Sequence, residues 1–198
     1  MADWNELTEA IRNCNRCVLR QGCTNVVPGE GNPDADIMFI GEGPGQEEDR
    51  TGRPFVGKAG ELLTKMIAAI GMKREDVYIC NTVKCRPPAN RTPMPEEMLA
   101  CKPYLREQFK LVRPKIIVLL GAAAGKDILG DQFRVTRDRG KWVERKGVWF
   151  MPTYHPSALL RNELLKRPAW EDFKAVLAKY NELKENQNGN DNDASNAE

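Results

Sequence analysis

Short runs of apolar residues alternate along the chain with longer stretches in which apolar residues recur every three or four positions. The short runs are typical of buried strands, and the longer stretches predict amphipathic helices. We expect strands at residues 35–40, 77–80, 115–120 and 147–152. We expect helices at residues 3–13, 58–70, 95–112, 121–129 and 168–183.

The order of these elements indicates the fold class. Strands that alternate with helices favour a parallel sheet that is covered on both faces. The sequence therefore predicts a three-layer α/β fold with a central four-stranded parallel sheet flanked by helices. We expect residues 1–183 to form this single domain and the polar, Asn-rich residues 184–198 to form a disordered tail.

Polar residues and glycines follow the predicted strands at their carboxyl ends. The segment GEGPG, at residues 41–45, follows the first strand, Asn81 follows the second and His155 follows the fourth. In open parallel sheets these ends meet at one edge, where ligands bind. We therefore expect a functional site there, with Gly43 and Gly45 allowing a ligand to approach the backbone closely.

Composition narrows the classes of protein further. The formal net charge is +2, but residues 184–198 are acidic, so the rest of the chain is moderately basic and weakly favours a polyanionic partner. No apolar run approaches the roughly 18 residues of a membrane span, and the start of the chain lacks the apolar core of a secretory signal. We expect a cytoplasmic, monomeric protein that does not associate with membranes.

The six cysteines favour metal binding, because disulfides are rare in the cytoplasm. Cys14 and Cys17 form a C-x2-C pair that can direct two thiolates at one centre. Cys85 lies in a proline-rich loop, and Cys101 faces inward on a predicted helix. Four thiolates suit either zinc or an iron–sulfur cluster. Buried structural thiols are the alternative, and Cys23 could replace one of the four ligands.

Three glycine-rich segments resemble nucleotide-binding motifs without meeting their requirements. GEGPG lacks the last glycine of GxGxxG, and its proline removes a backbone donor. Residues 52–58 have the Walker spacing, but Ala59 replaces the hydroxyl residue that binds Mg²⁺, and residues 121–126 are one residue short. The sequence therefore argues against nucleotide hydrolysis.

Three longer segments together resemble a known family. They are GEGPGQEEDRTGRPFVGKAG from Gly41, NTVKCRPPANRTP from Asn81 and HPSALLR from His155. With the four cysteines in the same order, the chain resembles family 4 uracil-DNA glycosylases, the iron–sulfur type, from about Cys14 to Arg161 and into the last helix. The resemblance implies a uracil-DNA glycosylase-like fold and a hydrolase that releases uracil from DNA in base excision repair.

The resemblance also implies roles for residues at the sheet edge. Phe55 would stack on the base, and Asn81 would accept from uracil N3–H and donate to O4, which excludes cytosine. His155 would hydrogen-bond uracil O2 as negative charge develops there, although a satisfied core residue is the alternative for a lone histidine. Glu48 would shape the pocket against the thymine methyl group, and Asn90 would contact the site or hold its loop.

The group that activates water is left open by the resemblance. The best-known branch of the superfamily has an Asp at the position of Gly43, so Glu42 is the candidate here. The HPSALLR loop would enter the DNA minor groove, with Ser157 in the DNA-binding loop, Leu159 as the wedge and Arg161 near a phosphate. Leu159 could instead be a buried helix residue.

The resemblance implies a structural [4Fe–4S] cluster held by Cys14, Cys17, Cys85 and Cys101. Residues 134–146 carry six basic and two acidic residues, which form a candidate phosphate track or a solvated hairpin. Two other functions stay open. One is a non-catalytic iron–sulfur module that binds damaged DNA or acts in replication, and the other is a zinc-stabilised hydrolase of small nucleosides.

Overall fold

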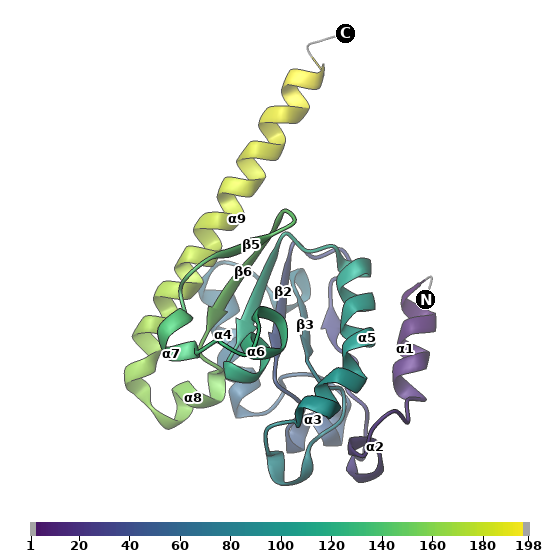
Figure 1. The fold of residues 1–198 in the computed structure, drawn as a ribbon. Coiled ribbons are helices and arrows are strands. Elements are labelled where there is room, and N and C mark those ends of the chain that lie inside the picture. Colours follow the sequence, from purple (N-terminus) through teal and green to yellow (C-terminus); the bar gives the residue numbers. More distant parts are fainter. Residues whose placement is uncertain (1–2, 196–198) are drawn as a thin grey trace.

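A six-stranded mixed sheet forms the centre of the computed structural model, which describes residues 3–195 (Figure 1). The strand order is β1-β3-β2-β4-β6-β5. The inner strands run parallel to one another, and each edge strand pairs antiparallel with its neighbour. The strands are β1 (Glu30–Gly31), β2 (Ile37–Gly41), β3 (Tyr78–Asn81), β4 (Ile116–Leu120), β5 (Val143–Arg145) and β6 (Val148–Thr153).

The inner strands confirm the predicted α/β fold class and its parallel sheet. β2 and β4 are buried along their whole length, as expected for a parallel sheet that is covered on both faces. The sequence does not predict the two edge strands. β1 and β5 are only two and three residues long and are partly exposed, so they carry no apolar run.

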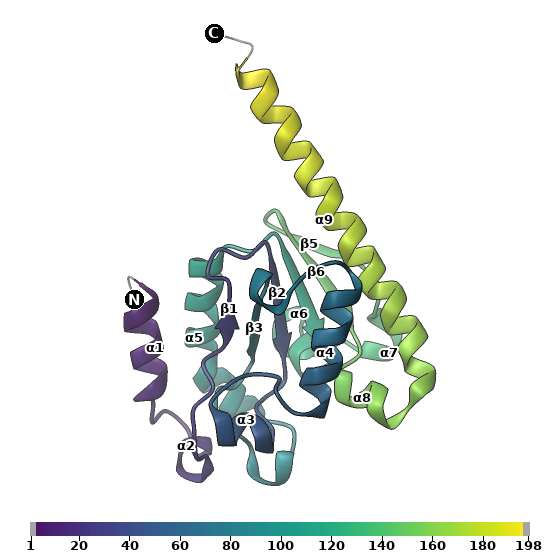
Figure 2. The same ribbon diagram turned by 180° about the vertical axis from the view of Figure 1, so that it is seen from behind.

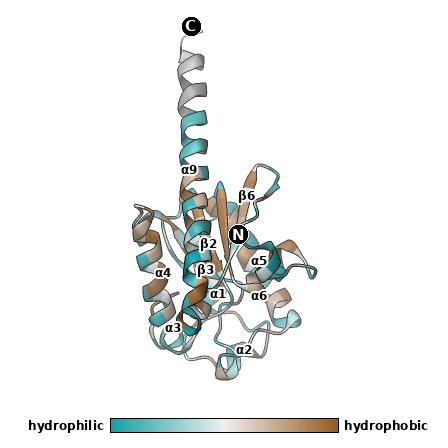
Figure 3. Ribbon diagram, turned by 90° about the vertical axis from the view of Figure 1, so that its left-hand side faces the viewer, coloured by the Kyte–Doolittle hydropathy of each residue, from teal (hydrophilic) through white to brown (hydrophobic). Residues whose placement is uncertain are grey.

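Helices cover both faces of the sheet (Figures 1 and 2). α4 (Lys58–Ala69) and α9 (Lys166–Ser195) pack on one face, and α5 (Pro95–Val112) and α6 (Ala122–Leu129) pack on the other. α1 (Trp4–Arg12) lies against the outside of α5. In Figure 3 the inner strands are mainly brown, whereas α4 and α5 carry both colours, as amphipathic helices do.

Shorter elements connect these layers, and most of them lie near the carboxyl edge of the sheet in Figure 1. The sequence does not predict them, because three to six residues are too few to show a helical period. The helices are α2 (Leu19–Gly22), α3 (Gln46–Thr51), α7 (Val135–Asp138) and α8 (Pro156–Arg161), and the 3-10 turns are η1 (Arg74–Asp76), η2 (Pro88–Asn90) and η3 (Glu163–Leu165).

The last helix, α9, extends away from the rest of the molecule at its carboxyl end (Figure 1). The sequence predicts a helix that ends near residue 183 and a disordered tail after it. In the structure the helix continues to Ser195, and residues 196–198 lie outside the described residues. The single domain over residues 1–183 and the disorder of the tail stay predictions. No helix in the described part of the chain is long and apolar enough to cross a membrane.

Candidate active site

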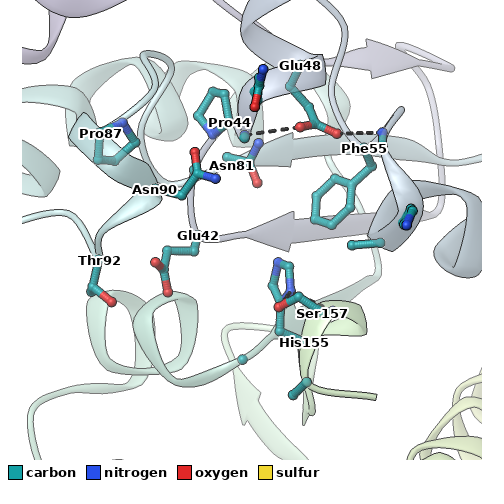
Figure 4. Close-up of a pocket in the computed structure, with 18 of the residues that line it drawn as sticks. Glu42, Pro44, Glu48, Phe55, Asn81, Pro87, Asn90, Thr92, His155 and Ser157 are labelled. Carbon is teal, nitrogen blue, oxygen red and sulfur yellow. Dashed lines mark hydrogen bonds between the residues drawn. The ribbon is translucent and has the colours of Figure 1, made fainter. Parts of the chain in front are cut away.

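A cavity of about 680 Å³ opens at the carboxyl edge of the sheet, beside the ends of β2, β3 and β6 (Figure 4). Its lining comes from segments that are far apart in the sequence. The predicted site residues that line it are Glu42, Gly43, Gly45, Glu48, Phe55, Asn81, Asn90, His155, Ser157 and Arg161.

Asn81 ends strand β3 and lines the cavity with its side-chain amide (Figure 4). The residue is only 2% exposed, and its Oδ1 atom is buried with no hydrogen-bond partner in the described part of the chain. A buried acceptor without a partner costs about 1–3 kcal/mol, so a ligand that donates to Oδ1 gains this energy. A Cβ atom on Gly41 would lie 2.5 Å from Oδ1 and 2.4 Å from Cζ of Phe55. Glycine at position 41 therefore leaves room for both side chains.

Phe55 presents a buried aromatic ring to the cavity, with its centroid 5.6 Å from that of the His155 ring. Its backbone has a φ of +50°, a conformation that costs a non-glycine residue about 1–3 kcal/mol. Arg74 opposes this cost, because its Nη1 donates to the Phe55 carbonyl at 2.9 Å and its Nη2 donates to the Pro54 carbonyl. Glu30 in turn accepts from Arg74 Nε at 2.8 Å.

Sequence reasoning did not find this Glu30–Arg74 clamp. The two residues are 44 positions apart, and each is a charged residue outside the recognised motifs. Only the folded chain, which places η1 beside β1, brings them together.

Glu48 uses both carboxylate oxygens to hold loops around the cavity. Oε1 accepts from the backbone N–H groups of Val56 and Gly57, each at 2.8 Å, and Oε2 accepts from the N–H of Gly45 at 3.1 Å (Figure 4). Glu48 therefore fixes the glycine-rich loop after β2 relative to the segment that carries Phe55. Its predicted role against a thymine methyl group stays a prediction.

His155 is the N-cap residue of α8, and its hydrogen bonds determine which ring nitrogen carries the proton. Nδ1 accepts from the backbone N–H of Ser157 at 3.1 Å and lies 2.8 Å from the Ser157 hydroxyl. Nε2 therefore carries the proton and is available as a donor. Burial, aided by the positive charge of Arg161 and opposed by Glu48, lowers the His155 pKa to about 4. At neutral pH the ring is an uncharged donor.

Comparison with known proteins identifies the family. A family model described as "Uracil DNA glycosylase superfamily" matches residues 28–174. The chain is 51% identical over 174 residues to a type-4 uracil-DNA glycosylase of Thermotoga maritima, with 85% of this chain and 90% of that protein covered. The chain belongs to the type-4 uracil-DNA glycosylase family. Further type-4 members include those of Sulfurisphaera tokodaii, 48% identical with 89% of this chain and 84% of the relative covered, and of Archaeoglobus fulgidus, 45% identical with 89% and 92% covered.

Glu42 is the candidate water-activating group in this member of the uracil-DNA glycosylase superfamily. Burial raises the Glu42 pKa, whereas a hydrogen bond with the Thr92 side chain and the charge of Arg161 lower it. Thr92 lies beside Glu42 in Figure 4, and the sequence did not single it out. Gly43 offers no side chain at this position, so Glu42 is the carboxylate that follows β2 directly.

Asn90 lines the cavity from a loop with two left-handed residues. Ala89 and Asn90 have φ values of +51° and +55°. The Asn90 Oδ1 accepts from Arg86 Nε at 2.7 Å, so part of its side chain holds the loop. The next residue, Arg91, pairs with the buried Glu97 at 2.7 Å and anchors the loop to α5.

The burial of Leu159 in α8 bears on its predicted role as the DNA wedge, which stays a prediction. Leu159, predicted to enter the groove, is 1% exposed and belongs to the main hydrophobic core. The adjacent Leu160 is 47% exposed. The six-residue helix thus directs Leu159 inward, as the alternative for this residue anticipated. Ser157 and Arg161 line the cavity.

Residues 134–146, the candidate phosphate track, form α7 and most of the β5 side of the β5–β6 hairpin. Some of their positive charges are already used inside the protein. Arg139 pairs with the buried Asp172, and Arg137 pairs with Asp138 at 2.7 Å. Lys141 and Lys146 are exposed, so only part of this segment can contact phosphates.

The cysteines gather in a second place, between α1, α2 and α5. Cys14, Cys17, Cys85 and Cys101 line one hollow, and the six cysteines are free thiols. The Cys85 thiol interacts with those of Cys23, Cys101 and Cys17, and burial together with these neighbours raises its pKa. The Cys101 thiol interacts with Cys14 and Cys17. Cys23 therefore lies near the set, although it does not line the hollow.

The arrangement of sulfurs bears on the kind of metal centre. Among the described residues no group of three or more His, Cys, Asp or Glu is close enough to hold a single metal ion. A zinc ion needs four sulfurs at about 2.3 Å from one point, whereas in a [4Fe–4S] cluster each thiolate binds a different iron and the sulfurs stand further apart. Four cysteines that line one hollow suit either a zinc ion or a cluster. The buried ammonium group of Lys84, which interacts with Cys101, also fits a centre that brings negative charge.

Proposed function

We propose that this protein hydrolyses the N-glycosidic bond of a deoxyuridine flipped out of DNA, releases uracil and leaves an abasic site, as the first step of base excision repair. The observation that carries the proposal is the unpaired, buried Oδ1 of Asn81 in the cavity that also contains Phe55 and the neutral donor His155. These groups complement the uracil N3–H, the base face and the uracil O2.

Recognition of uracil rests on the direction of the Asn81 amide. Oδ1 accepts from N3–H, and Nδ2 donates to O4. Cytosine carries an unprotonated N3 and an amino group at C4, so it would face acceptor with acceptor and donor with donor. Each mismatched buried group costs about 1–3 kcal/mol, which is enough to exclude cytosine from the cavity.

His155 stabilises the uracil anion as the bond breaks. The neutral Nε2–H donates to O2, where negative charge builds in the transition state, and no reorganisation is needed because Ser157 already fixes the ring. Removing a positioned donor of this kind lowers the rate by about 10²–10³-fold. The sugar becomes cationic at the same time, and Glu42 then holds the water that attacks C1′ and accepts its proton.

DNA contact follows from the position of α8 beside the cavity. Flipping a base costs a few kcal/mol, and an apolar wedge that fills the vacated stack offsets this cost. Leu160 is exposed on α8 and takes the role of the wedge. Arg161, beside it, contacts a phosphate, and the exposed part of residues 134–146 extends the positive surface.

A [4Fe–4S] cluster is held by Cys14, Cys17, Cys85 and Cys101 in this proposal, as the hollow that these residues line supports. When bound, the cluster supplies strong bonds to four thiolates and has a structural role. These cysteines then link the N-terminal segment to the loop that follows Asn81. A cytoplasmic location and a monomeric state stay predictions.

The decisive experiment measures uracil release from U·G, U·A and single-stranded DNA by the purified, iron-loaded protein. We expect release by the wild type and a loss of about 10²–10³-fold in His155→Ala. A wild type that binds uracil-containing DNA tightly but releases no base would reject the proposal in favour of a non-catalytic module. Zinc in place of iron and sulfide in the metal analysis would contradict the cluster.

A further inference from the structure

Lys84 is an unusual lysine, because its whole side chain is buried. It is 1% exposed and is one of the largest fully buried side chains among the described residues. It lies in the loop between Asn81, which ends β3, and Cys85, a proposed cluster ligand. Its carbonyl accepts from the Val27 N–H at 2.7 Å, so the loop is also held from the N-terminal segment.

The contacts of Lys84 reach both sites at once. The ammonium Nζ donates to the main-chain carbonyl of Asn81 at 2.7 Å and hydrogen-bonds the Cys80 sulfur. The backbone N–H of Lys84 donates to the sulfur of Cys101. A single residue thus contacts the strand end that recognises uracil and a sulfur that is proposed to bind the cluster.

Among residues 3–195 no ion pair joins the Lys84 ammonium group to a carboxylate. The partly buried Lys102 pairs with Asp127 and Lys115 pairs with Asp36, each at 2.7 Å. The Lys84 ammonium group instead donates to the neutral carbonyl of Asn81. Burial raises the pKa of the Cys80 thiol, which therefore stays neutral. A buried cation without a counter-charge is strongly destabilising.

Negative charge becomes available next to Lys84 when the proposed ligands bind metal, because ligating cysteines are thiolates. Cys101 is in direct contact with Lys84, and Cys85 is its neighbour in the chain. We propose that Lys84 is a positioning residue that couples the cluster to uracil recognition: its ammonium group balances the thiolate charge and, through the Asn81 carbonyl, holds the Asn81 amide in the orientation that uracil requires.

This inference rests on the proposed function and gives the metal centre a task beyond tying the chain together. Without the cluster, the buried ammonium loses its counter-charge and moves toward water, and Asn81 loses the bond that holds its main chain. Without the ammonium, the thiolates of the cluster lose a balancing charge. Each site should therefore respond to a change in the other.

The test compares Lys84→Met, which keeps the length of the side chain but removes the charge and the donor, with Lys84→Gln, which keeps a neutral donor. Lys102→Met is the matched control, because Lys102 lies on α5 next to Cys101 but pairs with Asp127. The measurements are the affinity for free uracil, the affinity for an abasic-site duplex, and the rate at which the visible absorbance of the cluster decays in air.

In Lys84→Met we expect free uracil to bind about 10–100-fold more weakly, as for the loss of a hydrogen bond to a charged group, with abasic DNA bound as in the wild type. We expect the cluster to decay about 10-fold faster or more, because an opposing charge next to it is gone. Lys84→Gln should recover part of the uracil affinity but not the cluster lifetime. The Lys102→Met control should match the wild type in each measurement.

Wild-type affinity for uracil and a wild-type cluster lifetime in Lys84→Met would overturn the coupling. Because a buried substitution can prevent folding, a second arm uses the wild type alone and compares holoprotein with protein stripped of iron, both checked by circular dichroism. Folded apoprotein that binds free uracil as tightly as the holoprotein would also overturn it. If the wild type releases no uracil, the proposed function itself is rejected. That result distinguishes a failure of the proposed function from a failure of the coupling.

Discussion

Two neighbouring leucines of α8 should respond to truncation in opposite ways. Leu159 is buried in the main core, in the same cluster as Phe173, whereas Leu160 is about half exposed on the surface of α8. A Leu→Ala change in a core lowers the free energy of unfolding by about 2–5 kcal/mol. A change at an exposed position away from special features stays within about 0.5 kcal/mol.

These energies convert to measurable shifts. In a chain of this length each kcal/mol lowers the melting temperature by roughly 2–4 °C, so Leu159→Ala should lower it by about 4–20 °C, and Leu160→Ala by about 2 °C or less. Leu160→Ala should instead reduce kcat/KM on duplex DNA by about 10–100-fold, because the vacated stack stays unfilled. Its activity on single-stranded DNA should not change, since that substrate has no partner strand to restack.

The assay pairs thermal unfolding with uracil release from U·A duplex and single-stranded DNA, for both variants and the wild type. The ratio of duplex to single-strand activity cancels any general loss of active protein. A Leu159→Ala variant of normal stability that loses only duplex activity would show that Leu159 is the wedge and that our assignment of Leu160 is wrong.

Three further predictions concern the cavity. The His155 pKa is lowered from 6.5 to about 4, so the neutral ring should support uracil release down to about pH 5. The contribution of His155 to folding stability should be complete above pH 6.5 and decline as the pH falls toward 4. A pH–rate profile that loses activity near pH 6.5 in the wild type but not in His155→Gln would contradict this. Arg74→Met should raise the KM for uracil-containing DNA about tenfold by freeing the strained Phe55. A wild-type KM in the folded variant would show that the Glu30–Arg74 clamp is not needed to position Phe55. Thr92→Val should move the acid limb of the kcat profile to higher pH, because the hydrogen bond that lowers the Glu42 pKa is lost; an unmoved limb would show that Glu42 is not the titrating group.

The central sheet could be predicted because each inner strand is a short, uninterrupted apolar run. The cavity residues could be predicted for a related reason, since Asn81 and His155 follow directly on such runs and the parallel topology brings those ends together. The edge strand β5 could not, because three partly exposed residues gain their order from pairing with β6. The local sequence pattern shows which runs are apolar, but it does not show which short segments become ordered by pairing with a distant strand.

The contacts and burial of individual side chains depend on long-range packing, which the local sequence pattern does not show. The Glu30–Arg74 clamp joins residues from separate turns of the chain, and the burial of Lys84 contradicts what its charge would suggest on a loop. Leu159 and Leu160 are chemically the same, and their roles are decided by the rotation of a helix of six residues. Such a helix takes its orientation from the core on which it packs.

The position of the cysteines along the chain has a consequence for the order of events during synthesis. The proposed ligands end at Cys101, which leaves the ribosome before β4, the strand that joins the two halves of the sheet, and well before His155. A nascent chain therefore holds the complete ligand set while its base pocket does not yet exist. With the proposed cluster, iron could therefore be delivered to the first half of the chain, and a chain arrested at that stage would hold metal without being able to act on DNA.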